Sequence, residues 1–247
     1  MERNASYSTL AEWFEYLNDD CDYENWSQYL IKKLTKNGMI LGVDSGIDIG
    51  CGGGYFTRVL QKYGYAMTGM DVSSEMLDKA QRVALKEGIR SEYILGDVAR
   101  VKIQRKYSFA ISINDCLNYV EGDKLKSAFK NVHGALKKGG VFLFDISSPK
   151  KYAEKFNDAV NVDDRDEVTY LSFAKTDGKT ATLEVTLFTK NADGSYSRSD
   201  ETHVQYVHTE QAITFALEEA GFTLLCVEGH LGEEKSISDR LVFLAKK

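Results

Sequence analysis

Acidic and amide side chains stand at the ends of successive short apolar runs in the first 150 residues. In chain order they are Asp48, Asp71, Asp97, Asn114 with Asp115, and Asp145. A carboxylate accepts hydrogen bonds from hydroxyl and amine donors and attracts positive charge. One acid at such a place needs no function, but five around one crevice favour a cationic ligand that carries several donors.

Glycines follow the first of these acids closely. The stretch from Gly46 to Gly54 has the pattern of a strand end, a tight turn and a helix start. Glycine permits positive φ and lets a ligand approach bare backbone, and the first turn of a helix offers free N–H groups. For these glycines alone, a structural turn that binds nothing is an equal alternative.

A dinucleotide fits this turn poorly. The G-x-G-x-x-G fingerprint needs a third glycine for close packing of the helix on the strand. Counting from Gly50 places Tyr55 at that position, and counting from Gly52 places Thr57 there. Asp48, two residues before Gly50, would also repel an anionic pyrophosphate.

S-adenosylmethionine is a ligand of the kind that the acids favour, because it is cationic and contains a nucleoside. Asp48 and its neighbours would suit the ammonium of its methionine part. Asp71 stands 21 residues after Gly50 and can accept hydrogen bonds from two ribose hydroxyls. Asp97 would suit the exocyclic amine of adenine.

Strands that alternate with helices must position these residues. Apolar runs predict strands at 43–49, 65–71, 92–97, 107–114 and 141–146, and helical spacing predicts helices at about 53–64, 73–88 and 125–140, the second capped by Ser73. This alternation implies parallel β-α-β units and an open α/β sheet. Such sheets bind ligands at the carboxyl ends of their strands, where the acids fall.

The pattern changes after residue 150. Three long strands are predicted at 168–174, 181–188 and 196–207, with turn residues at 176–178 and 191–194 between them. This antiparallel meander, an insertion of residues 151–207, is either a substrate cap beside the crevice or a dimerisation surface. A helix capped by Thr209 and strands at 222–227 and 240–244 then complete the main domain.

The combined motifs resemble those of class I S-adenosylmethionine-dependent methyltransferases. The run Asp48-x-Gly50-x-Gly52-x-Gly54 is similar to the first motif of that family, and Gly69-Met70-Asp71 and Gly96-Asp97 resemble its second- and third-strand acids. The resemblance covers about residues 40–150. It implies a Rossmann-like open seven-stranded sheet, mostly parallel with an antiparallel last strand, with helices on both faces. No N-P-P-Y run or other substrate-defining motif is present, since the only proline is Pro149.

The resemblance also implies a set of cofactor contacts. They are Tyr7, Trp26, Asp48, Gly50, Cys51, Gly52, Gly54, Asp71, Val72, Met76, Gly96, Asp97, Val98, Asn114 and Asp115. Tyr7 and Trp26 belong to two amphipathic helices expected within residues 5–37, which either pack simply on the domain or cover the ligand. We therefore divide the chain into an N-terminal helical lid (1–40), the cofactor-binding domain (41–150 and 208–247) and the insertion.

The composition limits the classes of partner that we expect for this protein. Of 247 residues 43% are hydrophobic, and a net charge of −6 with no dense basic run argues against a nucleic-acid substrate. The four cysteines form no C-x-x-C pair, which is typical of reduced cytosolic thiols and not of disulfides or a metal site. Because residues 1–4 lead into no apolar core region, we expect no signal peptide, and no apolar run approaches the roughly 20 residues needed to span a bilayer. We expect a cytoplasmic monomer or homodimer that uses no metal and does not bind membranes.

Methyl transfer from a sulfonium is an in-line displacement, and a base is needed only where the nucleophile is protonated. Candidate bases are Asp115, Tyr119, His203 and His208, although Tyr119 could be a core aromatic, His203 a surface residue and His208 a helix cap. The leading hypothesis is methyl transfer from S-adenosylmethionine to an O or N atom of a small molecule, with S-adenosylhomocysteine as product. The alternatives are a non-catalytic S-adenosylmethionine-binding or protein-interaction module and, less favoured, an NAD-dependent oxidoreductase.

Overall fold

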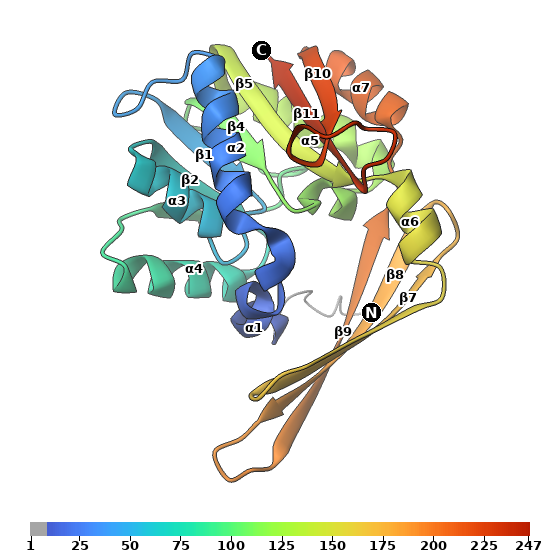
Figure 1. Cartoon of the computed structure of the whole chain (residues 1–247). Helices are drawn as coiled ribbons and strands as arrows, with labels where there is room; N and C mark the ends of the chain where they lie inside the picture. Colours follow the sequence, from blue (N-terminus) through green and yellow to red (C-terminus); the bar gives the residue numbers. More distant parts are fainter. Residues whose placement is uncertain (1–8) are drawn as a thin grey trace.

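The computed structural model describes residues 9–247, and its larger sheet has seven strands in the order β10-β11-β5-β4-β1-β2-β3 (Figure 1). The strands are β1 (Ser45–Ile49), β2 (Ala66–Asp71), β3 (Glu92–Leu95), β4 (Tyr107–Ser112), β5 (Leu136–Ser147), β10 (Thr223–Gly229) and β11 (Arg240–Lys246). The pairs formed among β1 to β5 are parallel, whereas β11 is antiparallel to both β5 and β10. The predicted open sheet with an antiparallel last strand is confirmed.

Both faces of this sheet are buried, and β5 shows how the sequence achieves it. Successive strand residues point to opposite faces. Phe142 and Phe144 pack in the cluster that includes α5 (Gly122–Ala135) and α7 (Glu210–Glu219). Val141 and Leu143 pack in the cluster that includes α2 (Tyr23–Lys36) and α3 (Tyr55–Tyr63). A strand covered on both faces therefore reads as a continuous apolar run.

The predicted helix starts are confirmed where a capping side chain was expected. The Ser73 hydroxyl accepts a hydrogen bond from the Met76 amide at the start of α4 (Ser74–Lys86). The Thr209 hydroxyl does the same for the Ala212 amide at the start of α7. Each cap satisfies one of the backbone donors that a helix leaves without an internal partner.

The predicted end of the fifth helix at residues 139–140 is wrong. α5 ends at Ala135, and Leu136 already pairs with Tyr107 as the first residue of β5. Gly140 lies so close to β4 that an added Cβ would stand 2.8 Å from the Ser108 carbonyl oxygen. Gly140 allows β5 to approach β4 where their register is irregular, and neither glycine ends the helix.

The insertion is a second antiparallel sheet, and it has one strand more than predicted. Its strands are β6 (Ala159–Asp164), β7 (Val168–Thr176), β8 (Thr180–Lys190) and β9 (Tyr196–Tyr206), in that order across the sheet. The short edge strand β6, with only two large apolar residues, gave no strand pattern, and α6 (Pro149–Lys155) before it was also not predicted. Figure 1 shows the long β8–β9 hairpin projecting away from the seven-stranded sheet.

The N-terminal segment forms the two expected helices, α1 (Leu10–Leu17) and α2, joined by the short helix η1 (Asp19–Cys21). α1 contacts both the insertion and helix α4 of the main domain. Leu10 packs with Val168, Val185 and Leu187 of the insertion, while Glu12 pairs with Arg82 of α4. Within residues 9–247, no helix has the length and apolar character needed to cross a bilayer.

Candidate active site

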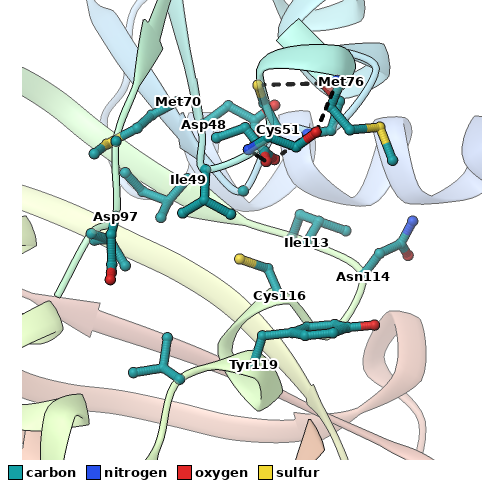
Figure 2. A pocket seen from close by; sticks show the side chains of 18 of the residues that line it. Asp48, Ile49, Cys51, Met70, Met76, Asp97, Ile113, Asn114, Cys116 and Tyr119 are labelled. Atoms are coloured by element: carbon teal, nitrogen blue, oxygen red, sulfur yellow. Dashed lines mark hydrogen bonds between the residues drawn. The ribbon is translucent and has the colours of Figure 1, made fainter. Parts of the chain in front are cut away.

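A cavity of about 890 Å³ opens at the carboxyl ends of β1, β2 and β4. Its walls come from the glycine turn, the ends of β2 and β3, the loop after β4, the α1 and α2 segment, and strand β9. Figure 2 shows Asp48, Cys51 and Met70 near one end and Asn114, Cys116 and Tyr119 near the other. The volume lies within the range of small-molecule sites.

The glycine turn joins β1 to α3 and is pinned to the end of β2. The amides of Gly50 and Cys51 both donate to the Met70 carbonyl, at 2.7 and 3.0 Å. Gly50 has φ +69°, and a side chain there would overlap the Cys116 sulfur. The position therefore requires glycine for its conformation and for the close approach of the β4 loop.

Asp71 closes this turn from the end of β2. One of its carboxylate oxygens accepts a hydrogen bond from the Gly52 amide at 2.8 Å, and the other accepts from the Ser73 amide at 2.9 Å. Burial raises its pKa, and the bonds from backbone amides oppose that rise. Asp71 lines the cavity, so its carboxylate both orders the turn and faces the ligand space.

Asp48 lies deeper, at the end of β1, and is 2% exposed. Its carboxylate accepts a 2.6 Å hydrogen bond from the Thr57 hydroxyl of α3. Burial raises the pKa of Asp48 to about 7, with the neighbouring Asp71 adding to the rise and the Thr57 bond opposing it. A buried acid with this pKa can change its charge when a cation arrives near neutral pH.

The end of β3 supplies the third predicted acid. Asp97 accepts a hydrogen bond from the Ala99 amide at 2.8 Å and pairs with Arg100 at 3.2 Å. Gly96 and Val98 line the cavity beside it. This part of the wall combines a hydrogen-bond acceptor with small apolar residues, which suits a nucleobase.

Several other expected contacts also border the cavity. Cys51, Gly52, Val72, Met76 and Asn114 line it, while Gly54 is the N-cap of α3 just behind. Trp26 of α2 is fully buried in the core, with its ring against Tyr29 and His230. Its position therefore does not support the predicted contact with the cofactor. Tyr7 lies outside the described residues.

The expectation that all the strand-end acids face one crevice is wrong for Asp115 and Asp145. Asp115 binds Arg240 at 3.2 Å and accepts a hydrogen bond from Gln205 at 2.9 Å, and neither acid lines the cavity. Burial opposes ionisation of Asp115, but Arg240 and Lys151 hold its pKa below the ordinary value. An ionised carboxylate already engaged by these partners is poorly suited to act as a base.

The two candidate histidines also lie outside the cavity wall. His203 is buried, not on the surface, and its Nε2 lies 3.3 Å from Glu201. His208 donates from Nε2 to the Val120 carbonyl at 2.9 Å, and burial lowers its pKa. Of the four candidate bases, Tyr119 is the one that lines the cavity.

The sequence offered the insertion as one possible cap but did not indicate which of its residues would reach the cavity. Thr202, Val204 and Tyr206 of β9 line the cavity, whereas His203 and Gln205 between them point the other way. The alternation was visible in the sequence, but the pairing of β9 with the rest of the molecule was not. Aromatic residues of the N-terminal segment and α3 also reach the cavity, with the Tyr23 and Tyr55 rings 4.3 Å apart.

Comparison with known proteins identifies the family of this chain. A family described as "Methyltransferase domain" matches residues 47–140. A methyltransferase-family protein of Geobacillus sp. (strain WCH70) is 30% identical over 247 residues, which cover 98% of this chain and 100% of that protein. An S-adenosylmethionine-dependent methyltransferase of known structure from Clostridium acetobutylicum ATCC 824 has a TM-score of 0.87 at 27% identity, over 98% of this chain and 99% of its own.

More distant structures share the fold. The amino pentose methyltransferase CalS10 of Micromonospora echinaspora has a TM-score of 0.75 at 15% identity and covers 99% of each chain. Likeness at that identity concerns the architecture alone. The full-length relationship to the Geobacillus protein, with the glycine turn and the acids beside it, shows that this chain belongs to the class I S-adenosylmethionine-dependent methyltransferases.

Proposed function

We propose that this methyltransferase acts on an O or N atom of a small molecule that lies between β9 and the loop after β4. The observation that carries the proposal is that Thr202, Val204 and Tyr206 of the insertion line the same cavity as the glycine turn. In this arrangement the insertion is an acceptor cap. The CalS10 protein, which shares the fold, is described as acting on an amino pentose, and this supports a small acceptor.

The residues at the glycine-turn end fit S-adenosylmethionine. Gly52, with φ +51°, has open space above its Cα apart from the Met76 sulfur at 3.8 Å, so backbone is exposed to a ligand. Asp71 would hold the ribose hydroxyls, Asp97 the adenine amine and Asp48 the ammonium. When bound, S-adenosylmethionine supplies a methyl group on a positively charged sulfur. This chain's part is to bind, orient and exclude water.

The charge of the cavity favours a neutral or cationic acceptor over an anionic one. Six acidic residues line it, and they are Glu15, Asp48, Asp71, Glu75, Asp97 and Glu121. The two basic lining residues, Arg100 and Lys124, are paired with Asp97 and Glu121. No lining cation is therefore left without an acidic partner to hold a phosphate or carboxylate among the described residues. An amine or hydroxyl acceptor suits this wall.

Polar groups without charge face the acceptor end. The side chains of Asn114, Tyr119, Thr202 and Tyr206 line the cavity there. Such groups can orient an amine or hydroxyl by hydrogen bonds, so that its lone pair points at the methyl carbon. We assign Tyr119 the role of relaying the acceptor's proton, with its oxygen accepting that proton as its own hydroxyl proton passes to solvent, because the other candidate bases lie outside the wall.

An acceptor screen tests the proposal. The chain is incubated with S-adenosylmethionine and a panel of small amines, amino sugars, phenols and carboxylates, and S-adenosylhomocysteine and methylated product are measured. Val204→Trp should reduce turnover of the best acceptor at least tenfold while leaving S-adenosylhomocysteine binding unchanged. Val162→Trp, which enlarges an exposed valine on edge strand β6, is the matched control. Binding of both sulfur ligands without turnover of any acceptor would favour the non-catalytic module.

A further inference from the structure

The loop after β4 contains two consecutive residues in a conformation that side chains disfavour. Asn114 has φ +65° and Asp115 has φ +48°. Asn and Asp tolerate the left-handed region better than most residues, but two in succession still need support from their surroundings. The loop continues into the short helix η2 (Cys116–Tyr119) and supplies Asn114, Cys116 and Tyr119 to the cavity.

Asp145 of β5 supplies that support. Its carboxylate is fully buried, with one oxygen accepting from the Asn114 amide at 2.8 Å and the other from the Asp115 amide at 3.2 Å. Arg240 donates to the same carboxylate and lies 3.2 Å from the Asp115 carboxylate. β11 pairs with β5 so that Arg240 stands opposite Ser147, two positions along from Asp145, and its guanidinium bridges both acids.

The same loop is bonded to the insertion. Gln205 of β9 donates to Asp115 at 2.9 Å, and Asn118 of η2 donates to the Tyr206 carbonyl at 2.9 Å. The side-chain oxygen of Asn118 accepts from the Ser147 amide of β5 at 2.9 Å. Residues 114–119, which we call the left-handed loop, therefore form the junction at which β5, β11 and β9 meet.

We propose that Asp145 and Arg240 are positioning residues for methyl transfer. Neither lines the cavity, but together they hold the left-handed loop that presents Asn114 and Tyr119, and through Asp115 they fix the register of β9 against it. Loss of the Asp145 carboxylate should misplace the acceptor wall while the glycine turn keeps its cofactor contacts. The inference rests on the proposed function only in assigning that wall to the acceptor.

The first test measures stability and needs no acceptor. Asp145→Asn keeps the shape of the side chain but offers one acceptor oxygen in place of two, so the unfolding equilibrium should shift by about tenfold or more toward the unfolded chain. Asn114→Gly permits positive φ without support. Urea denaturation would compare the effect of Asp145→Asn in two backgrounds. In the Asn114→Gly background it should shift the unfolding equilibrium several-fold less than it does in the wild type. Strictly additive effects would overturn the assigned support.

The second test separates positioning from general damage. Asp145→Asn should lower kcat/KM for the acceptor found in the screen at least tenfold, and the S-adenosylhomocysteine dissociation constant, to which Asn114 of this loop is expected to contribute, should change several-fold less. Asp239→Asn is the control, because Asp239 is adjacent in sequence to Arg240 but pairs with Lys150 and Lys155 near the surface. Equal loss of turnover and of S-adenosylhomocysteine binding, or equal turnover in both variants, would contradict the positioning role.

The two tests fail separately. If the screen finds no acceptor, the proposed function fails, and the double-variant experiment still decides whether Asp145 supports the loop. If an acceptor is found but Asp145→Asn turns it over normally, the proposed function stands and the positioning role is wrong.

Discussion

Replacement of Asp48 by asparagine should stabilise the ligand-free protein above neutral pH while weakening its hold on the cofactor. The carboxyl of Asp48 is buried, with the Thr57 hydroxyl as its hydrogen-bond donor at 2.6 Å. Asparagine keeps an oxygen that can accept the same bond. It removes the ionisation that burial disfavours.

The magnitude follows from the pKa. Burial raises the pKa of Asp48 from 3.8 to about 7. Since a tenfold change is worth about 1.4 kcal/mol, the folded chain gains about 4 kcal/mol from the neutral acid below pH 4. Because the folded pKa is the higher one, this contribution is fully present below the unfolded value. It is lost as pH rises toward 7, and the unfolded chain then gains more by ionising.

Urea denaturation of the ligand-free protein at several pH values between 4 and 8 measures the effect. Asp48→Asn should match the wild type near pH 4 and exceed its free energy of unfolding at pH 8 by up to about 4 kcal/mol. Asp166→Asn, which removes an exposed carboxylate, is the control for the loss of one negative charge. Parallel wild-type and Asp48→Asn profiles would refute the assignment of a buried neutral acid.

Asp48→Asn should weaken cofactor binding, although it raises the free energy of unfolding. We infer that the ammonium of S-adenosylmethionine stabilises the ionised form of Asp48, so binding near pH 7 should release a proton. Calorimetric titrations in buffers of different ionisation enthalpy would detect that proton. At pH 8 Asp48→Asn should bind about tenfold or more weakly, as expected for loss of a buried charge pair. Undiminished binding would remove Asp48 from the set of cofactor contacts.

Three further outcomes follow from the site geometry. Gly50→Ala should lower the free energy of unfolding by about 2 kcal/mol or more, because the added methyl group overlaps the Cys116 sulfur and the backbone has a positive φ. Gly88 also has a positive φ, +71°, but open space around it, so Gly88→Ala should cost only about 1 kcal/mol in the same urea denaturation assay. Asp71→Asn should weaken S-adenosylmethionine binding by about 2 kcal/mol in calorimetry, since an amide nitrogen cannot accept the bonds that the carboxylate accepts. Tyr119→Phe should leave S-adenosylhomocysteine binding unchanged and lower acceptor turnover at least tenfold at neutral pH, whereas unchanged turnover would reduce Tyr119 to a packing residue.

The cofactor side of the cavity was accessible to sequence reasoning because its determinants are local. A strand that ends on an acid and turns through glycines into a helix carries its own signal within about ten residues. Asp48, Asp71 and Asp97 accordingly stand around the carboxyl ends of β1, β2 and β3, as the strand-end rule predicts. The same rule grouped Asp115 and Asp145 with them, and there it failed.

The failure has a physical cause that no local pattern contains. The partner that withdraws Asp115 and Asp145 from the cavity is Arg240, which lies about a hundred residues further along the chain on the antiparallel last strand. Its position depends on the register of β11 with β5, which the sequence does not specify. The glycines at 139–140 illustrate a related ambiguity, because glycine ends helices and also permits close approach of strands.

In the proposed function, strand β9 provides the acceptor side of a general cofactor fold. Its period of two divides the strand into residues that face the cavity, such as Val204, and residues that anchor it, such as Gln205. The anchoring residues bind the left-handed loop, which also carries Tyr119, so the cap and the candidate base are positioned by one junction. The side chains of the cavity-facing residues do not hold that loop. Acceptor preference can therefore change at positions 202, 204 and 206 without loosening the cap, which is the arrangement that a shared cofactor site with variable acceptors requires.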